Sequence, residues 1–240
     1  MPVVCHYFVA AMACWLFGPA QAADGPEAPL RLVNLSPLDA PNMVAMRNTL
    51  DVAFARAGMR YTIRYLPPER ALASFIAGQF DGDPNRGPQF QLFFPDAIRI
   101  EPHLRTAWYF AVSASPEVRP KSWEDLKRYH IAFLRGLHGV DVMTRGVVLR
   151  EMVPSHEACI RMAQIKRVDL CIVSSESADR RKFEEKYGSQ LYSTQFEHLN
   201  IYLWLSPNQR AAADKLTRAM RGMAASGELQ KLMGPYRADE

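Results

Sequence analysis

The chain has 240 residues, of which 48% are hydrophobic and 22% are charged. This composition is typical of a folded globular protein and excludes a disordered chain, a collagen-like fibre and a coiled coil. The length is enough for one or two domains whose cores need no metal or disulfide. The 29 Lys and Arg residues exceed the 25 Asp and Glu residues by four and are dispersed along the sequence. Because nucleic-acid binding requires clustered basic residues, we expect no nucleic-acid partner.

Residues 1–22 differ in composition from the rest of the chain. They contain no Asp, Glu, Lys or Arg, and positions 3–17 are almost continuously apolar. A helix-breaking Gly-Pro pair follows at 18–19, and then Ala-Gln-Ala at 20–22, a signal-peptide cleavage pattern. The apolar run is too short to span a membrane. The sequence therefore predicts a secretory signal peptide cleaved after Ala22 and a soluble, exported protein; the alternative is a buried N-terminal helix.

Cleavage would leave two of the four cysteines, Cys159 and Cys171. An exported protein can form disulfides, and two cysteines allow only one pairing. However, Cys171 lies in the apolar run 168–173, where a free cysteine is an ordinary core residue. We favour two buried thiols, with a disulfide as the alternative.

The mature sequence begins with a predicted strand at 30–35, followed by a helix with Asn42 as its expected N-cap and Gly58 as its stop. Apolar residues recur there at spacings of three and four, which places them on one face of a helix: Met43, Met46, Leu50, Phe54 and Ala57. Further along, the patterns predict strands at 61–66, 108–112, 130–134, 168–173 and 199–205. They predict helices at 69–77, 155–164, 206–225 and 227–233. Three more helices are predicted by one end only: one begins at 122, one begins at 140, and one follows the strand 168–173 and ends at 187.

This alternation of strands and helices predicts an α/β fold with a mainly parallel sheet, rather than a β-sandwich or a helix bundle. No internal repeat, low-complexity segment or Pro/Gly-rich linker interrupts the mature sequence. Two sequential domains joined by a tether are therefore not expected.

Four segments together resemble a known family. They are ERALASFIAGQFDG at 69–82, SWEDL followed by IAFLRG at 122–136, the stretch 158–172 with RVD at 167–169, and ASGEL at 225–229. Each motif alone is weak, but their order and spacing over about residues 30–234 resemble the family-3 periplasmic solute-binding proteins, which serve amino-acid-type ABC importers.

The resemblance implies a two-lobe periplasmic-binding-protein fold of type II, each lobe a mainly parallel sheet flanked by helices. Lobe 1 would be discontinuous, comprising 23–109 and 198–240, and lobe 2 would comprise 110–197. A small-molecule solute would bind in the cleft, which closes by hinge motion. The implied function is solute binding in the periplasm and delivery to the membrane permease of an ABC importer, by a monomer without a cofactor.

The segment DGDPNRG at 81–87 is the first candidate for a binding function. The spacing of Asp81, Asp83 and Asn85 is that of the first ligands of a calcium loop. However, Gly87 stands at loop position 7 rather than 6, and Leu92 occupies position 12, where a Glu is required. We therefore expect no metal there. The resemblance implies instead that Arg86 clamps a ligand carboxylate with its planar fork of donors, with Arg70 as the second candidate. The alternative is a polar turn after a strand.

The turn from Gly136 to Gly139 is the second candidate, because free backbone N–H groups at a helix start can hold anions. Family members carry Thr or Ser in this turn; here His138 either contacts the ligand or is an exposed loop histidine without a function. Ser174 stands where amino-acid binders often place an Asp that holds the ligand ammonium. Since Ser supplies no charge, the resemblance favours an anionic organic solute over an α-amino acid.

Three consecutive aromatic residues at 108–110 lie where the first crossover between the lobes is expected. Successive strand residues point to opposite faces, so at least one of them should be core. Tyr109 is the one expected to line the cleft.

No G-x-S-x-G, H-E-x-x-H, P-loop or metal-ligand spacing is present in the sequence, so we expect no catalytic residue and no metal site. The main alternative is an enzyme on the same scaffold, resembling cyclohexadienyl dehydratases or lytic transglycosylases. Such an enzyme would need an acid or base in the cleft, and Glu176, Asp83 and His138 are the candidates. A sensory input protein is a third alternative.

Overall fold

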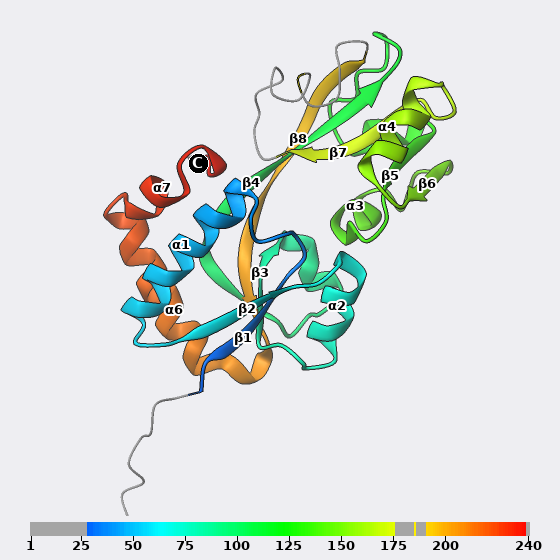
Figure 1. Ribbon diagram of the computed structural model, residues 1–240. Coiled ribbons are helices and arrows are strands. Elements are labelled where there is room, and N and C mark those ends of the chain that lie inside the picture. The colour runs from blue at the N-terminus through cyan, green and yellow to red at the C-terminus, as the bar shows by residue number, and fades with distance from the viewer. Residues whose placement is uncertain (1–27, 176–184, 186–190, 239–240) are drawn as a thin grey trace, which may run out of the picture.

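The computed structural model describes residues 28–175, Glu185 and residues 191–238. Its strands form one continuous sheet in the order β2-β1-β3-β8-β4-β7-β5-β6. Two long antiparallel strands, β4 (Ile98–Ser113) and β8 (Tyr192–Leu205), occupy the centre and run through both lobes (Figure 1). The predicted signal peptide lies outside the described residues, as does most of the predicted helix that ends at 187.

Lobe 1 places helices on both faces of its half of the sheet. Side chains along the first strand alternate: Leu32 packs with α1, α6 and α7, whereas Val33 packs with α2 and the short 3-10 helix η1. The elements are β1 (Leu30–Asn34), α1 (Pro41–Arg56), β2 (Tyr61–Tyr65), α2 (Pro68–Ile76), β3 (Gly82–Arg86), η1 (Pro88–Leu92), α6 (Arg210–Ala225) and α7 (Glu228–Met233).

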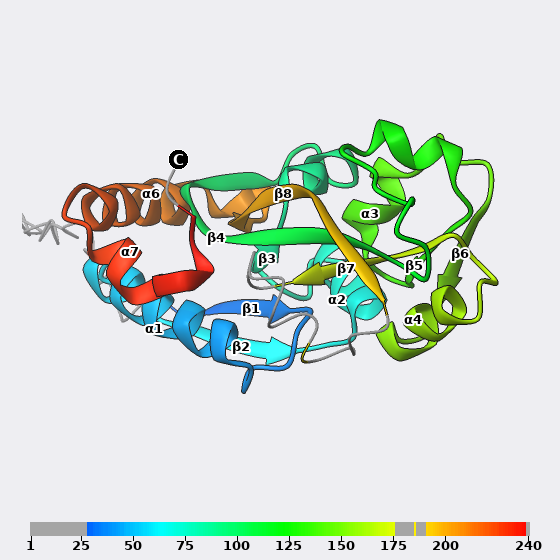
Figure 2. The same ribbon diagram turned by 90° about the horizontal axis from the view of Figure 1, so that it is seen from above.

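Lobe 2 repeats this layered arrangement at the other end of the molecule (Figure 2). Phe133 packs into one core cluster, and its neighbour Ala132 packs on the opposite face. Ser155 caps α4, as predicted, by accepting a hydrogen bond from the Ala158 amide at 3.1 Å. The elements are η2 (Glu124–Arg128), β5 (Ile131–Leu134), α3 (His138–Met143), β6 (Arg150–Val153), α4 (His156–Gln164) and β7 (Leu170–Ser175).

The predicted α/β class with mainly parallel pairing in each lobe is confirmed. Strands β1, β2 and β3 pair in parallel, as do β5, β6 and β7, while the crossing strands β4 and β8 supply the antiparallel pairs. Within the described ranges, no helix is long and apolar enough to cross a membrane.

Two local predictions are wrong. Asn42 does not cap α1; Ala40 holds the N-cap position, Pro41 begins the helix, and Asn42 is buried in its first turn. The polar turn considered as the alternative for 81–87 is not formed, because residues Gly82–Arg86 are the buried strand β3. Proline is compatible with this strand because Pro84 lies at a register shift between Asp83 and Arg86, where the ladder with β8 is interrupted.

The favoured prediction of two buried thiols is also wrong, because Cys159 and Cys171 form a disulfide. Their Cα atoms are 5.6 Å apart, within the range that a disulfide spans, and both residues are fully buried. The bond ties α4 to β7 over a sequence separation of 12 residues.

Removing this disulfide should destabilise the protein. For the chain from residue 23 onward, replacing both cysteines with Ala should lower the free energy of unfolding by about 2–4 kcal/mol, because the unfolded chain regains the freedom of the closed loop. Denaturant titration measures this loss, and the unreduced, denatured wild type should react with no thiol reagent. Two reactive thiols per denatured chain would contradict the disulfide.

Candidate ligand-binding cleft

A cavity of about 760 Å³ is lined by residues from both lobes and from the crossing strands β4 and β8. Most of the sequence-predicted site residues lie on it: Arg86, Tyr109, Gly136, His138, Gly139 and Ser174. Arg70 does not; its side chain is exposed on α2, outside the lining residues. The cavity therefore brings together chain segments that are far apart in the sequence.

Arg86 reaches the cavity from a buried ion pair. Its Nε donates to Asp83 Oδ2 at 2.7 Å, and the two side chains are 7% and 0% exposed. The guanidinium carbon also lies 5.5 Å from the centre of the Phe90 ring. Arg86 Nη2 is buried and has no hydrogen-bond partner among the described residues. Arg86 is thus fixed by Asp83 at the cavity wall, with a donor atom that has no partner among the described residues.

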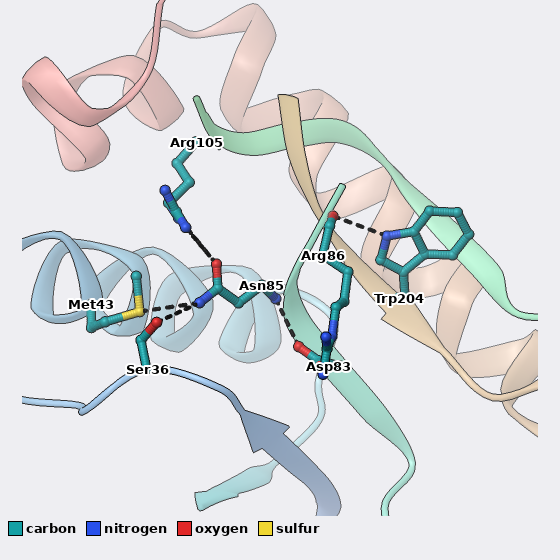
Figure 3. Close-up of polar contacts among 7 residues, drawn as sticks. All are labelled: Ser36, Met43, Asp83, Asn85, Arg86, Arg105 and Trp204. Carbon is teal, nitrogen blue, oxygen red and sulfur yellow. Dashed lines mark hydrogen bonds and ion pairs between the residues drawn. The ribbon is translucent and has the colours of Figure 1, made fainter. Parts of the chain in front are cut away.

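Arg105 is a second buried guanidinium on the cavity, and the sequence analysis missed it. It extends from β4, is 9% exposed, and donates from Nη2 and Nε to Asn85 Oδ1 at 2.6 and 3.2 Å. Asn85 in turn donates from Nδ2 to Ser36 Oγ at 3.2 Å. Figure 3 shows Asn85 pointing from β3 toward Arg105 and α1, while Arg86 lies beside Asp83. A neutral amide therefore orients the Arg105 guanidinium.

The side chains that line the cavity are suited to binding a negatively charged ligand. The described residues that line it include Arg86 and Arg105 but no Asp or Glu. Burial and the nearby Arg86 lower the pKa of His138, against the opposing effect of Asp141 and Glu69, which favours the neutral imidazole. Its Nε2 is buried without a partner in the described part of the chain.

Tyr109 lines the cavity as an uncharged phenol. Burial raises the pKa of Tyr109 to about 12, although the Arg105 charge acts in the opposite direction. Its ring packs edge-on against Trp123, with centroids 5.2 Å apart. Trp108 and Phe110 pack on the other face of β4, as the alternation along a strand predicts.

The two lobes touch beside the cavity. The ring centroids of Phe93, which follows η1, and His138 on α3 are 5.6 Å apart. Gly136 has a φ of +85°, and a Cβ placed on it would lie 2.9 Å from Pro68 Cβ at the start of α2. Glycine at this position therefore permits a close approach of the turn to lobe 1.

The three acid–base candidates occupy different surroundings. Asp83 is engaged with Arg86, His138 lies on the cavity, and Glu176 is outside the described residues. Among the residues that the structure describes, no group of three or more His, Cys, Asp or Glu side chains is placed to hold a metal ion.

Comparison with known proteins supports the fold. No protein-family model matches the chain. An uncharacterized protein of Shewanella oneidensis is 21% identical over 191 residues, covering 75% of this chain and 70% of its own length.

Solved structures are similar over most of both chains. The substrate-binding protein of an amino acid ABC transporter aligns with a TM-score of 0.64 and 12% identity, covering 87% of this chain and 99% of its own. The GluR0 ligand-binding core in complex with L-glutamate gives 0.67 and 12%, with coverages of 89% and 100%. A histidine kinase sensor domain with similarity to periplasmic binding proteins gives 0.65 and 11%, with coverages of 87% and 95%. The chain has the two-lobe fold of these proteins.

Removing one partner of the buried ion pair on β3 should destabilise the protein strongly. Arg86→Ala leaves the Asp83 carboxylate buried without its partner, so the free energy of unfolding should fall by about 3–5 kcal/mol. The double variant Asp83→Asn, Arg86→Gln should lose less, because no charge remains buried. Urea denaturation of the purified variants measures both losses.

Asp125 and Arg128 provide a matched control, because they form an ion pair of the same i,i+3 spacing with Arg128 74% exposed. Arg128→Ala should change the free energy of unfolding by about 1 kcal/mol or less. Equal losses for Arg86→Ala and Arg128→Ala would contradict the importance of the buried pair.

Proposed function

We propose that the protein is a periplasmic binding protein that holds a small anionic organic solute in the cleft and delivers it to the permease of an ABC importer. In this proposal residues 23–109 and 198–240 form lobe 1, and residues 110–197 form lobe 2. The observation that carries the proposal is a 760 Å³ cavity whose described lining has two buried arginines and no carboxylate.

The two arginines would share the recognition of an acidic group. Hydrogen bonds between a guanidinium and a carboxylate are among the strongest in proteins, because both partners are charged. Arg105 is held by the neutral Asn85, and Arg86 offers Nη2 while Asp83 fixes its Nε. An anion buried without such donors would be costly. The role first predicted for Arg86, with Arg70 as the second candidate, is therefore proposed for Arg86 and Arg105.

An α-amino acid fits this lining less well than a simple organic acid. Its ammonium group would need an acidic or strongly accepting partner, and Ser174 lines the cavity where amino-acid binders often carry Asp. None of the described residues that line the cavity is acidic. We therefore propose a ligand with a carboxylate and no ammonium group.

Arg105→Gln should weaken ligand binding well over tenfold, because removing one partner of a buried charged contact costs about 2–5 kcal/mol. A thermal-shift screen of organic acids, amino acids and opines identifies binders, since a saturating ligand stabilises the native state. Calorimetry then gives the affinity of each binder for wild type and variant, and analysis of the recovered ligand reveals any turnover.

Arg105→Lys should recover only part of the affinity, because Lys lacks the planar fork. Arg70→Gln is the control: this exposed residue is outside the cavity lining, so its replacement should leave the affinity unchanged. Unchanged affinity in a folded Arg105→Gln variant would contradict the proposed anchor, and the absence of any anionic binder would contradict the proposed function.

Gly136→Ala should weaken binding by about tenfold or more, because it should destabilise the closed arrangement of the two lobes. The new methyl group would meet the rigid Pro68 ring at 2.9 Å, and such overpacking costs about 1–3 kcal/mol. Gly58→Ala is the matched control, because Gly58 has a similar φ of +67° with no atom within 4 Å of the new Cβ. If both variants bound ligand equally, the contact between Gly136 and Pro68 would have no part in closure.

A further inference from the structure

The floor of the cavity is formed by the two crossing strands. Arg105, Ala107 and Tyr109 are alternate residues of β4, so they face the same side, and all three line the cavity. Leu199 and Ile201 of β8 complete the floor, because Ala107 is paired with Leu199 and Arg105 with Ile201. The pairing has no register shift between Arg105 and Tyr109.

This arrangement makes the floor charged at one end and apolar along the rest of its length. It begins at the Arg105 guanidinium, continues over the apolar side chains of Ile201, Ala107 and Leu199, and ends at the Tyr109 ring. The four steps along an extended strand from Arg105 to Tyr109 span about 13 Å. Ala107, which is 4% exposed, presents only a methyl group in the middle of this path.

Lobe 2 adds apolar side chains to the same cavity. Leu134, Leu137 and Val140 line it from the end of β5 and the start of α3. Leu137 and Val140 pack in the same core cluster as Leu199 and Ile201. The apolar part of the floor is therefore close to a second apolar surface, and the one formal positive charge on the floor lies at its end.

We propose that the ligand is an elongated, apolar monocarboxylic acid, with its carboxylate on Arg105 and its alkyl or aryl body along Ala107 and Leu199 toward Tyr109. This inference rests on the proposed function and specifies the substrate class of the same site. Small polar acids and amino acids have no apolar body to place along this floor.

The test uses a series of straight-chain acids, butanoate, hexanoate and octanoate, together with 3-phenylpropanoate. Because each buried methylene contributes about 0.8 kcal/mol, the affinity measured by calorimetry should rise by up to about fourfold per methylene along the series. 1-Octanol, which lacks the carboxylate, should bind much more weakly than octanoate.

Ala107→Leu should block the path in its middle. We expect octanoate and 3-phenylpropanoate to lose at least tenfold in affinity, while butanoate loses little. Ala107→Ser changes the volume less and places a hydroxyl on the apolar section, so it serves if the Leu variant does not fold. In Ala107→Ser, the gain in affinity per methylene should be smaller than in wild type.

The outcomes separate this inference from the proposed function. If succinate, citrate or an amino acid bound and required Arg105 while the apolar acids did not bind, the substrate class would be wrong and the anionic-solute function would stand. An affinity that does not depend on chain length would also overturn the inference. So would equal losses of affinity for butanoate and octanoate in Ala107→Leu. If no acid of any kind bound, both proposals would fail.

Discussion

The burial of a polar strand in the middle of the sheet is the constraint on which the cleft depends. Strand β3 has the sequence GDPNR, carries no large apolar side chain, and is buried along its whole length. Taking Asp83 and Arg86 out of water costs several kcal/mol for each ion, and only close pairing with good geometry offsets that cost. The pair at 2.7 Å provides this compensation for Asp83 and Arg86, and the bonds from Arg105 satisfy the buried amide oxygen of Asn85. The same contacts fix both guanidinium groups at the cavity.

The crossing strands turn this local arrangement into a site between lobes. Because β4 runs through both lobes, it contributes to the cores of both: Ile100 and Leu104 pack in lobe 1, whereas in lobe 2 Trp108 and Phe110 pack on one face and Ala107 and Tyr109 on the other. The charged residue Arg105 lies on the same strand, near the polar strand β3 that orients it. A single strand thus joins the charged part of the cleft to its apolar part.

The element order was predictable from the sequence because hydrophobic periodicity and turn signals are local properties. The strand β3 was not predictable in this way: Gly, Asp, Pro and Asn are typical of turns, and their pairing with Arg105 and Trp204 across the sheet overrides that preference. Arg105 escaped notice because the strand was expected to begin at Trp108, whereas β4 begins at Ile98. A basic residue two positions before a run of apolar residues was the available signal.

The disulfide illustrates the same limit of local patterns. An apolar run around Cys171 is compatible with either a thiol or a bridge, and only the packing of α4 on β7 brings Cys159 to a Cα distance of 5.6 Å. For the cleft, the sequence predicted the residues that local motifs mark, such as Arg86 and His138. It did not reveal which distant segments meet them.

The two lobes contribute different chemistry to the cleft, and this division bears on how closure is driven. The guanidinium groups come from lobe 1 and the adjoining part of β4, whereas Leu134, Leu137 and Val140 come from lobe 2. A ligand can shift an open–closed equilibrium only by its differential affinity for the two states. An acidic group held by Arg86 and Arg105 would make these two contacts with lobe 1 whether the cleft is open or closed. The apolar body of the proposed ligand would gain contacts with Leu134, Leu137 and Val140 of lobe 2 only on closure, so the hydrocarbon would favour the closed state.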